Sequence, residues 1–174
     1  LNSIGGNAFV RYPLVIKKAA GTHLLEPLGQ IAWGWRDQAK VSNDESSHPE
    51  FDMGNLIAIS RFAASDRYED GSHGAYGLRY SYETVKNYRF DLGLGKVLRD
   101  ENHYGFTDSS GLKDRKSENY ITGIITLPQN SYLSFQGLMD GKLRSKKSTL
   151  TGSLDFRTFN FDAEYSYLQS DLME

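Results

Sequence analysis

The 174-residue sequence contains no cysteine and only four prolines, and no apolar run in it approaches the length of a membrane-spanning helix. The missing cysteines exclude a disulfide framework and a thiolate metal site. A spanning helix needs about 18 consecutive apolar residues, so a helical membrane protein is excluded as well. The net charge of −2 gives no electrostatic basis for a nucleic-acid partner.

Alternation with a period of two residues is the main pattern in the sequence. From Gly74 to Tyr82 the even positions are glycine, aromatic or aliphatic, whereas the odd positions from His73 to Glu83 are small or charged. Successive side chains of a strand point to opposite faces, so such a strand separates an apolar medium from a polar one. The 17 glycines and the aromatic content of 13% also favour strands and turns over helices.

The same alternation predicts an all-β fold, an antiparallel transmembrane β-barrel segment with about eight spanning strands in a meander, each close to the length that crosses a bilayer. Apolar rows would face lipid, and charged rows would face a hydrated interior. Pro27 removes one donor from the strand ladder and predicts a local bulge. The strands are expected at residues 6–17, 22–36, 73–83, 87–98, 118–127, 131–140, 148–157 and 159–169.

The connections between the expected strands alternate between short turns and long loops. The short turns lie at residues 18–21, 84–86, 128–130 and 157–158, and the long loops at 37–72, 99–117 and 141–147. They alternate without exception only if residues 54–62, which include the apolar run at 56–59, do not cross the membrane. We therefore expect residues 1–174 to form a single β-barrel segment, in which 37–72 is one large extracellular loop and 56–62 packs at the barrel mouth.

An unpaired strand edge cannot be satisfied in hydrocarbon, so the expected sheet must close on itself or pair with further strands. Eight strands can close into a small barrel, but side chains fill its interior. Residues 1–4 lack the pattern of a signal peptide, and residues 171–174 lack a terminal aromatic side chain. We therefore expect that the sequence is part of a longer chain.

A distinctive group of residues lies in the middle of the chain. It comprises Asp52, Asn55-Leu56, Ser60-Arg61-Phe62, Asp66-Arg67, Glu69, Gly71 and Tyr76-Gly77-Leu78-Arg79-Tyr80. These residues resemble the pattern D-x-N-L-F, N-R-F, D-R-x-E-x-G, Y-G-L-R-Y in the barrel region of the LptD family, the lipopolysaccharide-assembly or organic solvent tolerance proteins. Ile57 and Ser60 replace the usual Phe and Asn. The resemblance implies an internal arc of a larger barrel, in the cell outer membrane, that inserts lipopolysaccharide into the outer leaflet.

The resemblance also implies the partners and the absence of catalysis. Lipopolysaccharide would be the cargo, a plug lipoprotein similar to LptE and periplasmic bridge proteins would be protein partners, outer-membrane lipid would surround the wall, and no cofactor is expected. Residues expected to line the substrate path are Glu26, Gln30, Arg79, Arg89 and Asp91. A basic group at the predicted external hairpin is formed by Lys142, Arg144, Lys146 and Lys147. This group either keeps the hairpin soluble or contacts lipid phosphates, with which cations pair strongly.

Two other function classes remain open. The chain could be an independent small outer-membrane barrel, either an adhesin or a lipid-modifying enzyme, although no Ser or His with acid and base partners is evident. It could also be a soluble lipocalin-like binder, whose apolar rows would face inward. The four histidines are scattered, and the acidic run from Asp44 to Asp52 lacks the spacing of a calcium loop, so no metal site is expected.

Overall fold

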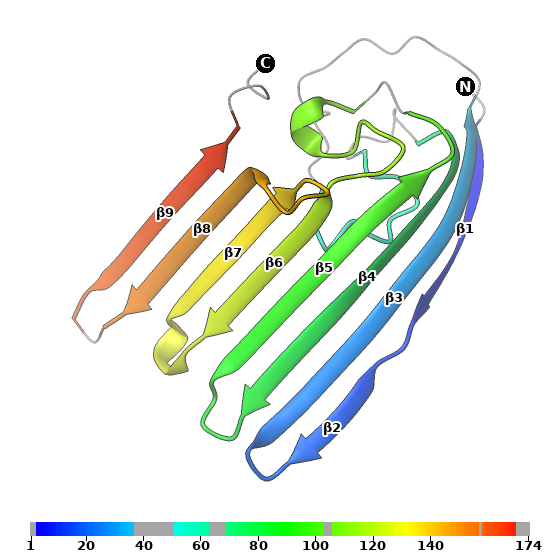
Figure 1. The fold of residues 1–174 in the computed structure, drawn as a ribbon. Coiled ribbons are helices and arrows are strands. Elements are labelled where there is room, and N and C mark those ends of the chain that lie inside the picture. Colours follow the sequence, from blue (N-terminus) through cyan, green and yellow to red (C-terminus); the bar gives the residue numbers. More distant parts are fainter. Residues whose placement is uncertain (1–2, 37–50, 63–68, 103–105, 157, 170–174) are drawn as a thin grey trace.

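The computed structural model describes residues 3–36, 51–62, 69–102, 106–156 and 158–169. These residues form one antiparallel sheet of nine strands (Figure 1). The strands are β1 (Ser3–Arg11), β2 (Leu14–Lys18), β3 (Gly21–Arg36), β4 (Gly71–Thr84), β5 (Arg89–Arg99), β6 (Asn119–Thr126), β7 (Tyr132–Met139), β8 (Ser145–Asp155) and β9 (Asn160–Leu168). Two short 3-10 elements, η2 (Asp108–Ser110) and η3 (Pro128–Asn130), lie in connections. None of the helices that the structure describes has the length and apolar character needed to cross a bilayer.

The order of the strands in the sheet is a meander. From β3 to β9 each strand pairs with its neighbour in sequence, while β1 and β2 both pair with β3. The predicted all-β, antiparallel architecture is therefore confirmed. The one difference in strand number arises because the strand expected at residues 6–17 is divided into β1 and β2.

The bulge predicted at Pro27 is wrong. Arg11 pairs with Leu28 and Leu14 pairs with Leu25, so the same register holds on both sides of the interruption. The Tyr12 N–H donates to the Pro27 carbonyl at 3.1 Å, but Pro27 has no N–H to return the bond. The missing donor interrupts the edge of the ladder between β1 and β2 without inserting an extra residue.

The connections lie at opposite ends of the sheet (Figure 1). The end that carries the connections from β3 to β4, β5 to β6 and β7 to β8 is called the loop end, and the other is the turn end. Residues 37–50 and 63–68 of the expected loop 37–72, including most of its acidic run, lie outside the described residues. Residues 51–62, called the inner segment below, contain turns and no strand.

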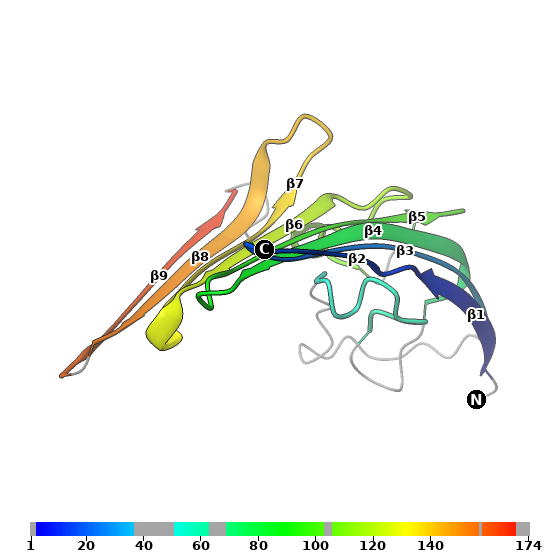
Figure 2. The same cartoon turned by 90° about the horizontal axis from the view of Figure 1, so that it is seen from below.

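The two faces of the sheet differ in chemistry. One face, called the outer face, carries exposed apolar side chains at successive alternate positions of β3 and β4. For example, Ile31 is 71% exposed and Tyr76 is 52% exposed. The opposite, inner face is concave where β1–β5 form it, and the inner segment lies on that side (Figure 2). The inner segment therefore leaves the outer face uncovered. This is the face that carries the apolar side chains expected to contact lipid.

The buried core lies between the inner face and the loop segments, at the loop end. Its members come from the inner segment, from the β5–β6 connection and from inward positions of the strands. They are Leu28, Phe51, Leu56, Phe62, Ala75, Val97, Phe106, Leu112, Tyr120 and Leu138. Tyr120 lies on the inner face of β6, and its ring meets the Phe51 ring at a centroid distance of 5.6 Å. This contact gives the inward Tyr120 ring an apolar partner at the loop end.

Candidate functional site

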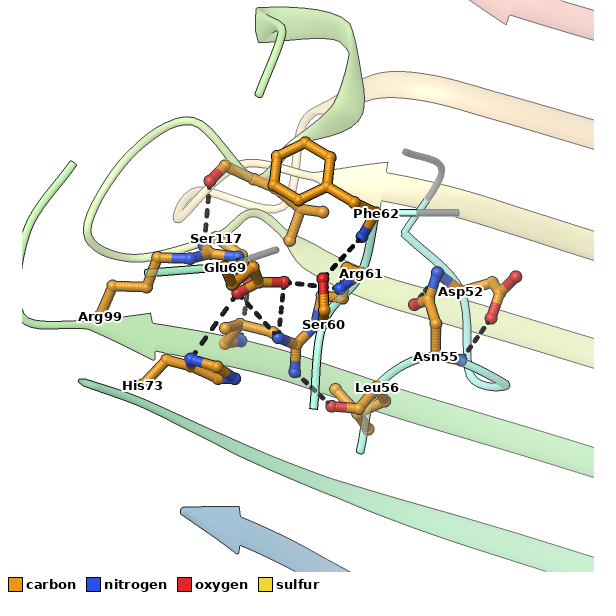
Figure 3. Close-up of polar contacts among 12 residues, drawn as sticks. Asp52, Asn55, Leu56, Ser60, Arg61, Phe62, Glu69, His73, Arg99 and Ser117 are labelled. Carbon is orange, nitrogen blue, oxygen red and sulfur yellow. Dashed lines mark hydrogen bonds and ion pairs between the residues drawn. The ribbon is translucent and has the colours of Figure 1, made fainter. Parts of the chain in front are cut away.

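The inner segment begins with a turn that two of the singled-out polar residues close. The Asn55 N–H donates to the Asp52 carboxylate at 2.8 Å, and the Asp52 N–H donates to the Asn55 side-chain oxygen at 3.0 Å (Figure 3). Short polar side chains of this kind replace backbone partners in tight turns. The reciprocal pair fixes the direction in which the next residue, Leu56, enters the core.

Leu56 is the apolar anchor of the inner segment. It is 1% exposed and packs on the backbone of β4 and β5. A Cβ atom at Gly77 would lie 2.6 Å from the Leu56 Cδ2, and one at Gly95 would lie 2.8 Å from it. The two glycines therefore create the space that the leucine fills. The close approach places the segment directly on the sheet.

A buried ionic cluster holds the other end of the inner segment (Figure 3). The Arg61 guanidinium donates to both Glu69 oxygens, at 3.0 and 3.1 Å, and the Arg61 N–H donates to the same carboxylate at 2.9 Å. Arg61 also donates to the Leu56 carbonyl at 2.6 Å. The side chains of Arg61 and Glu69 are 0% and 1% exposed. One carboxylate therefore fastens both the backbone and the side chain of the segment.

Arg99 connects this cluster to β5 and to the β5–β6 connection. It donates to Glu69 at 3.2 Å and to the Leu112 carbonyl at 2.9 Å. Its guanidinium lies 4.7 Å from the centre of the Phe106 ring. Phe106 in turn stacks on Phe62 of the inner segment, at 4.5 Å. Two loops and one strand are thus joined around a single anion.

The charge state of Glu69 follows from its surroundings. Burial raises the pKa of the Glu69 carboxyl, but the positive charges of Arg61 and Arg99 outweigh burial and hold the pKa below its ordinary value. The carboxylate is therefore ionised at neutral pH. His73, near the start of β4, has its Nδ1 3.8 Å from Glu69. The cluster is structural in character, because its side chains bond to backbone groups and to one another.

The residues predicted to line a substrate path lie on the inner face, in two regions. Glu26 and Arg79 are register partners across β3 and β4, and Arg79 donates to the Met53 carbonyl of the inner segment at 2.9 Å. Nearer the turn end, Asp91 accepts a hydrogen bond from Ser81 and pairs with Arg89 at 2.7 Å. These four side chains form a partly exposed polar strip with charges of both signs.

Gln30, the fifth predicted path residue, lies in the covered part of the inner face. It is 5% exposed, and within the described residues its side-chain nitrogen and oxygen have no hydrogen-bond partner. It is register partner to Ala75, one row from the ionic cluster. The structure therefore separates Gln30 from the open polar strip.

The four basic residues predicted at an external hairpin lie along the β7–β8 hairpin, but they have different surroundings. Arg144 pairs with Asp140 at 2.7 Å, and Lys146 pairs with Glu118 at 2.6 Å. Lys146 is the extra residue of a bulge, since β7 pairs with the residues on either side of it. Lys147 lies on the inner face and lines a cavity of about 210 Å³ beneath the loop segments.

Comparison with known families shows which family this chain belongs to. A family model described as LptD, LPS transport system D, matches residues 7–174. The chain belongs to the LptD family. The comparison with curated proteins finds no match. Membership of LptD assigns the chain a role in lipopolysaccharide transport and assembly at the outer membrane, and the LptD family is a transport family rather than an enzyme family.

LptD membership also explains the open edges of the sheet. The sheet has two free edges in the part of the chain that the structure describes, because β1 and β9 are its first and last strands. A spanning sheet needs all of its backbone groups paired. The chain is accordingly a segment of the LptD barrel, as the sequence predicts.

The geometry gives roles to the residues that carry the LptD resemblance. Asp52 and Asn55 close the turn, Arg61 and Glu69 form the ionic cluster, and Gly77 admits Leu56. Sequence reasoning noted these residues without assigning them a common purpose, and it gave neither Arg99 nor His73 a part in such a cluster. The opposite charges of Arg61 and Glu69 are visible in the sequence, but Asp66 and Arg67 between them are charged as well, so the sequence does not single out the pair. Among the described residues, no group of three or more His, Asp or Glu side chains could hold a metal ion.

Proposed function

We propose that the inner face of this sheet lines the path by which the LptD barrel delivers lipopolysaccharide to the outer leaflet, with the loop end toward the cell exterior. The proposal rests on the difference between the two faces. Apolar side chains are exposed on the outer face at positions such as Ile31 and Tyr76, as hydrocarbon contact requires. Opposite charges occupy the inner face at positions such as Glu26 and Arg79.

A polar strip with both signs of charge suits an amphiphile that carries sugars and phosphates. Arg79 and Arg89 offer guanidinium donors, which bind phosphate oxygens strongly. Neighbouring carboxylates, such as Asp91 at 2.7 Å from Arg89, limit how tightly a phosphate would be held. A path must release its cargo, and such balanced sites favour passage over permanent binding.

The inner segment would narrow this path at the loop end. It fills the space above Gly77 and Gly95 with Leu56, and Glu69 fastens it through Arg61. The polar strip toward the turn end stays uncovered. The proposed path is therefore open toward the turn end and covered by the inner segment at the loop end. Because the loop end is covered, cargo would leave the barrel sideways rather than along its axis.

The proposal extends to the partners of the complete barrel. Membership of a lipopolysaccharide transport family supports lipopolysaccharide as cargo, a plug lipoprotein similar to LptE inside the barrel, and bridge proteins on the periplasmic side. It also favours this function over an independent adhesin or a lipid-modifying enzyme. The exposed basic hairpin residues, Lys142 above all, are proposed to contact lipid phosphates outside the membrane.

Orientation is tested by labelling from outside intact cells. Lys142→Cys, at the loop end, and Lys86→Cys, at the turn end, are introduced separately into a cysteine-free form of the complete protein. A membrane-impermeant maleimide should label the first variant and not the second until the outer membrane is permeabilised. Labelling of the Lys86 position alone in intact cells would reverse the orientation.

Passage along the inner face is tested with photocrosslinking residues at neighbouring positions of β7. A probe at Gln136, on the inner face, should capture lipopolysaccharide, and the adduct should disappear soon after lipopolysaccharide export is blocked. A probe at Phe135, on the outer face, should capture resident membrane lipid whether or not export continues. A Gln136 probe that never yields lipopolysaccharide would refute the proposed path.

A further inference from the structure

The outer face of the sheet carries an ionic residue at the loop end, Lys96. Outward positions before it on β5, Phe90, Leu92 and Leu94, are apolar, and Leu98 follows it. The register sets Lys96 beside Tyr76 of β4. The registers show which described positions of β3, β4, β5, β6, β7 and β9 lie on the outer face. Lys96 is the only Lys, Arg, Asp or Glu among those described positions. A lysine in such a row is costly to place against hydrocarbon, so its surroundings merit explanation.

Asn119 holds the Lys96 ammonium in place. The Lys96 Nζ donates to the Asn119 side-chain oxygen at 3.0 Å. The Asn119 amide nitrogen donates to the carbonyls of Met139 and Asp140, at 3.2 and 3.0 Å. The amide is therefore fixed by the start of the β7–β8 hairpin. This arrangement orients Lys96 but leaves two of its three N–H donors for another acceptor.

Lys96 differs from the other loop-end cations in its counter-ion. Arg144 pairs with Asp140, and Lys146 pairs with Glu118. Among the described residues, no carboxylate lies within 4.0 Å of the Lys96 ammonium. Its acceptor, the Asn119 oxygen, is neutral. An ammonium at the edge of an apolar surface, held by a neutral amide, is complementary to an anion supplied from outside the protein.

An apolar groove of about 360 Å³ begins beside this ammonium. Its lining includes Tyr76, Leu78, Leu94, Lys96, Ile121 and Leu143. Leu143 belongs to the β7–β8 hairpin and is 68% exposed, so its side chain is free to contact a ligand in the groove. The groove and the cation together match a molecule with an anionic head and an apolar tail.

We propose that Lys96, Asn119 and this groove bind a lipid A phosphate and one of its acyl chains on the outside of the barrel wall. The inference rests on the proposed function for its orientation, because only a loop end at the cell exterior brings Lys96 to the leaflet that contains lipopolysaccharide. Lys142 and Arg144 follow directly in the adjacent hairpin, and a ligand with two phosphates can engage both places. The site would retain delivered lipopolysaccharide next to the wall, separately from the inner path.

The test uses the complete protein in its own outer membrane, with a photocrosslinking residue at Leu143. This probe should capture lipopolysaccharide, while a probe at Phe90, at the turn end of the same face, should capture phospholipid. Lys96→Gln should lower the Leu143 adduct by about tenfold, because one charged contact is lost. Lys96→Arg should keep most of the adduct, and Lys86→Gln should leave it unchanged.

A second variant tests the side chain that holds Lys96. Asn119→Asp gives Lys96 a carboxylate on the protein and removes the amide donors to the Met139 and Asp140 carbonyls, so it should also lower the adduct severalfold. Both variants are checked for normal amounts and normal heat-dependent mobility of the folded barrel. An adduct that is unaffected by Lys96→Gln and Asn119→Asp, or that contains phospholipid, would overturn the inference. If the Gln136 probe still captures lipopolysaccharide in that case, the proposed function stands without this site.

Discussion

Arg61 and Glu69, eight residues apart, are joined by three hydrogen bonds, two from the guanidinium and one from the backbone N–H. Both side chains are almost fully excluded from solvent. Such an ion pair is costly to bury but far more costly to break, since the remaining partner is then an isolated charge. The Glu69 carboxylate therefore fixes the position of the inner segment on the sheet.

Replacing Glu69 by Gln is expected to destabilise the protein by about 3–5 kcal/mol, because the Arg61 and Arg99 guanidiniums would lose their buried counter-ion. Urea unfolding followed by the fluorescence of Trp33 and Trp35 measures this change. Glu83→Gln is the matched control, since Glu83 is exposed and should change the free energy of unfolding by no more than about 0.5 kcal/mol. Equal effects of the two substitutions would show that the cluster does not hold the segment.

Replacing Gly77 by Ala should also displace the inner segment. The new Cβ would lie 2.5 Å from the Leu94 carbonyl oxygen and 2.6 Å from Leu56, and a backbone atom cannot move away as a side chain can. Overpacking of this kind costs about 1–3 kcal/mol. Gly123→Ala is the control, because its nearest neighbour would be at 3.9 Å. Limited proteolysis within residues 51–62 should become faster in the first variant only.

Two neighbouring residues of β7 can test which face meets the lipid. Leu133 is 47% exposed on the outer face, whereas Ser134 lies on the inner face. Leu133→Arg should cost about 2–4 kcal/mol in a lipid bilayer, because arginine is then placed against hydrocarbon. Ser134→Arg should cost much less, since Ser134 faces the proposed hydrated path, with Ile124 and Thr151 as its register partners. Refolding into lipid vesicles at graded urea concentrations gives the change in folding free energy for each variant. A larger cost for Ser134→Arg than for Leu133→Arg would show that the inner face, and not the outer face, meets the lipid.

The β7–β8 hairpin should respond to strong acid. Hydrogen bonds from the backbone N–H of Arg144, followed by its side chain and the Lys142 N–H, lower the pKa of Asp140 from 3.8 to about 2. Because the folded pKa lies below the unfolded one, the stabilisation is complete above pH 4 and is lost as the pH falls toward 2. A carbon-detected NMR titration of the Asp140 carboxyl should show this midpoint. Arg144→Gln keeps the backbone N–H but removes the guanidinium, so it should raise the midpoint, and a midpoint that does not move would exclude the contribution of the Arg144 side chain.

The strands could be predicted because a barrel wall imposes a two-residue period. Positions such as Tyr76 and Leu78 alternate with Gly77 and Arg79, and this local signal needs no knowledge of partners. The boundaries of β4 and β5 are accordingly within a few residues of those expected. The alternation of short and long connections also follows, since each strand reverses the chain direction.

The contacts of the loops could not be predicted in the same way. The distance between Glu69 and Arg99 in space depends on how two separate connections fold over the sheet, and no periodic pattern records it. The prediction of a bulge at Pro27 is wrong because the effect of the missing donor depends on the opposite strand, where Pro13 also lacks one. Lys96 went unnoticed because a single cation in an apolar row is visible only after the row is assigned to a face.

The inner segment and its fastening groups come from a continuous part of the chain. Arg61, Glu69, His73 and Arg99 all precede β6, and Leu112 lies just before it. The pairing of β4 with β5 therefore completes the ionic cluster before the later hairpins are needed. During biogenesis this piece can consolidate early and serve as a template on which subsequent strands add, so that the cap is in place by the time the wall becomes a closed cylinder.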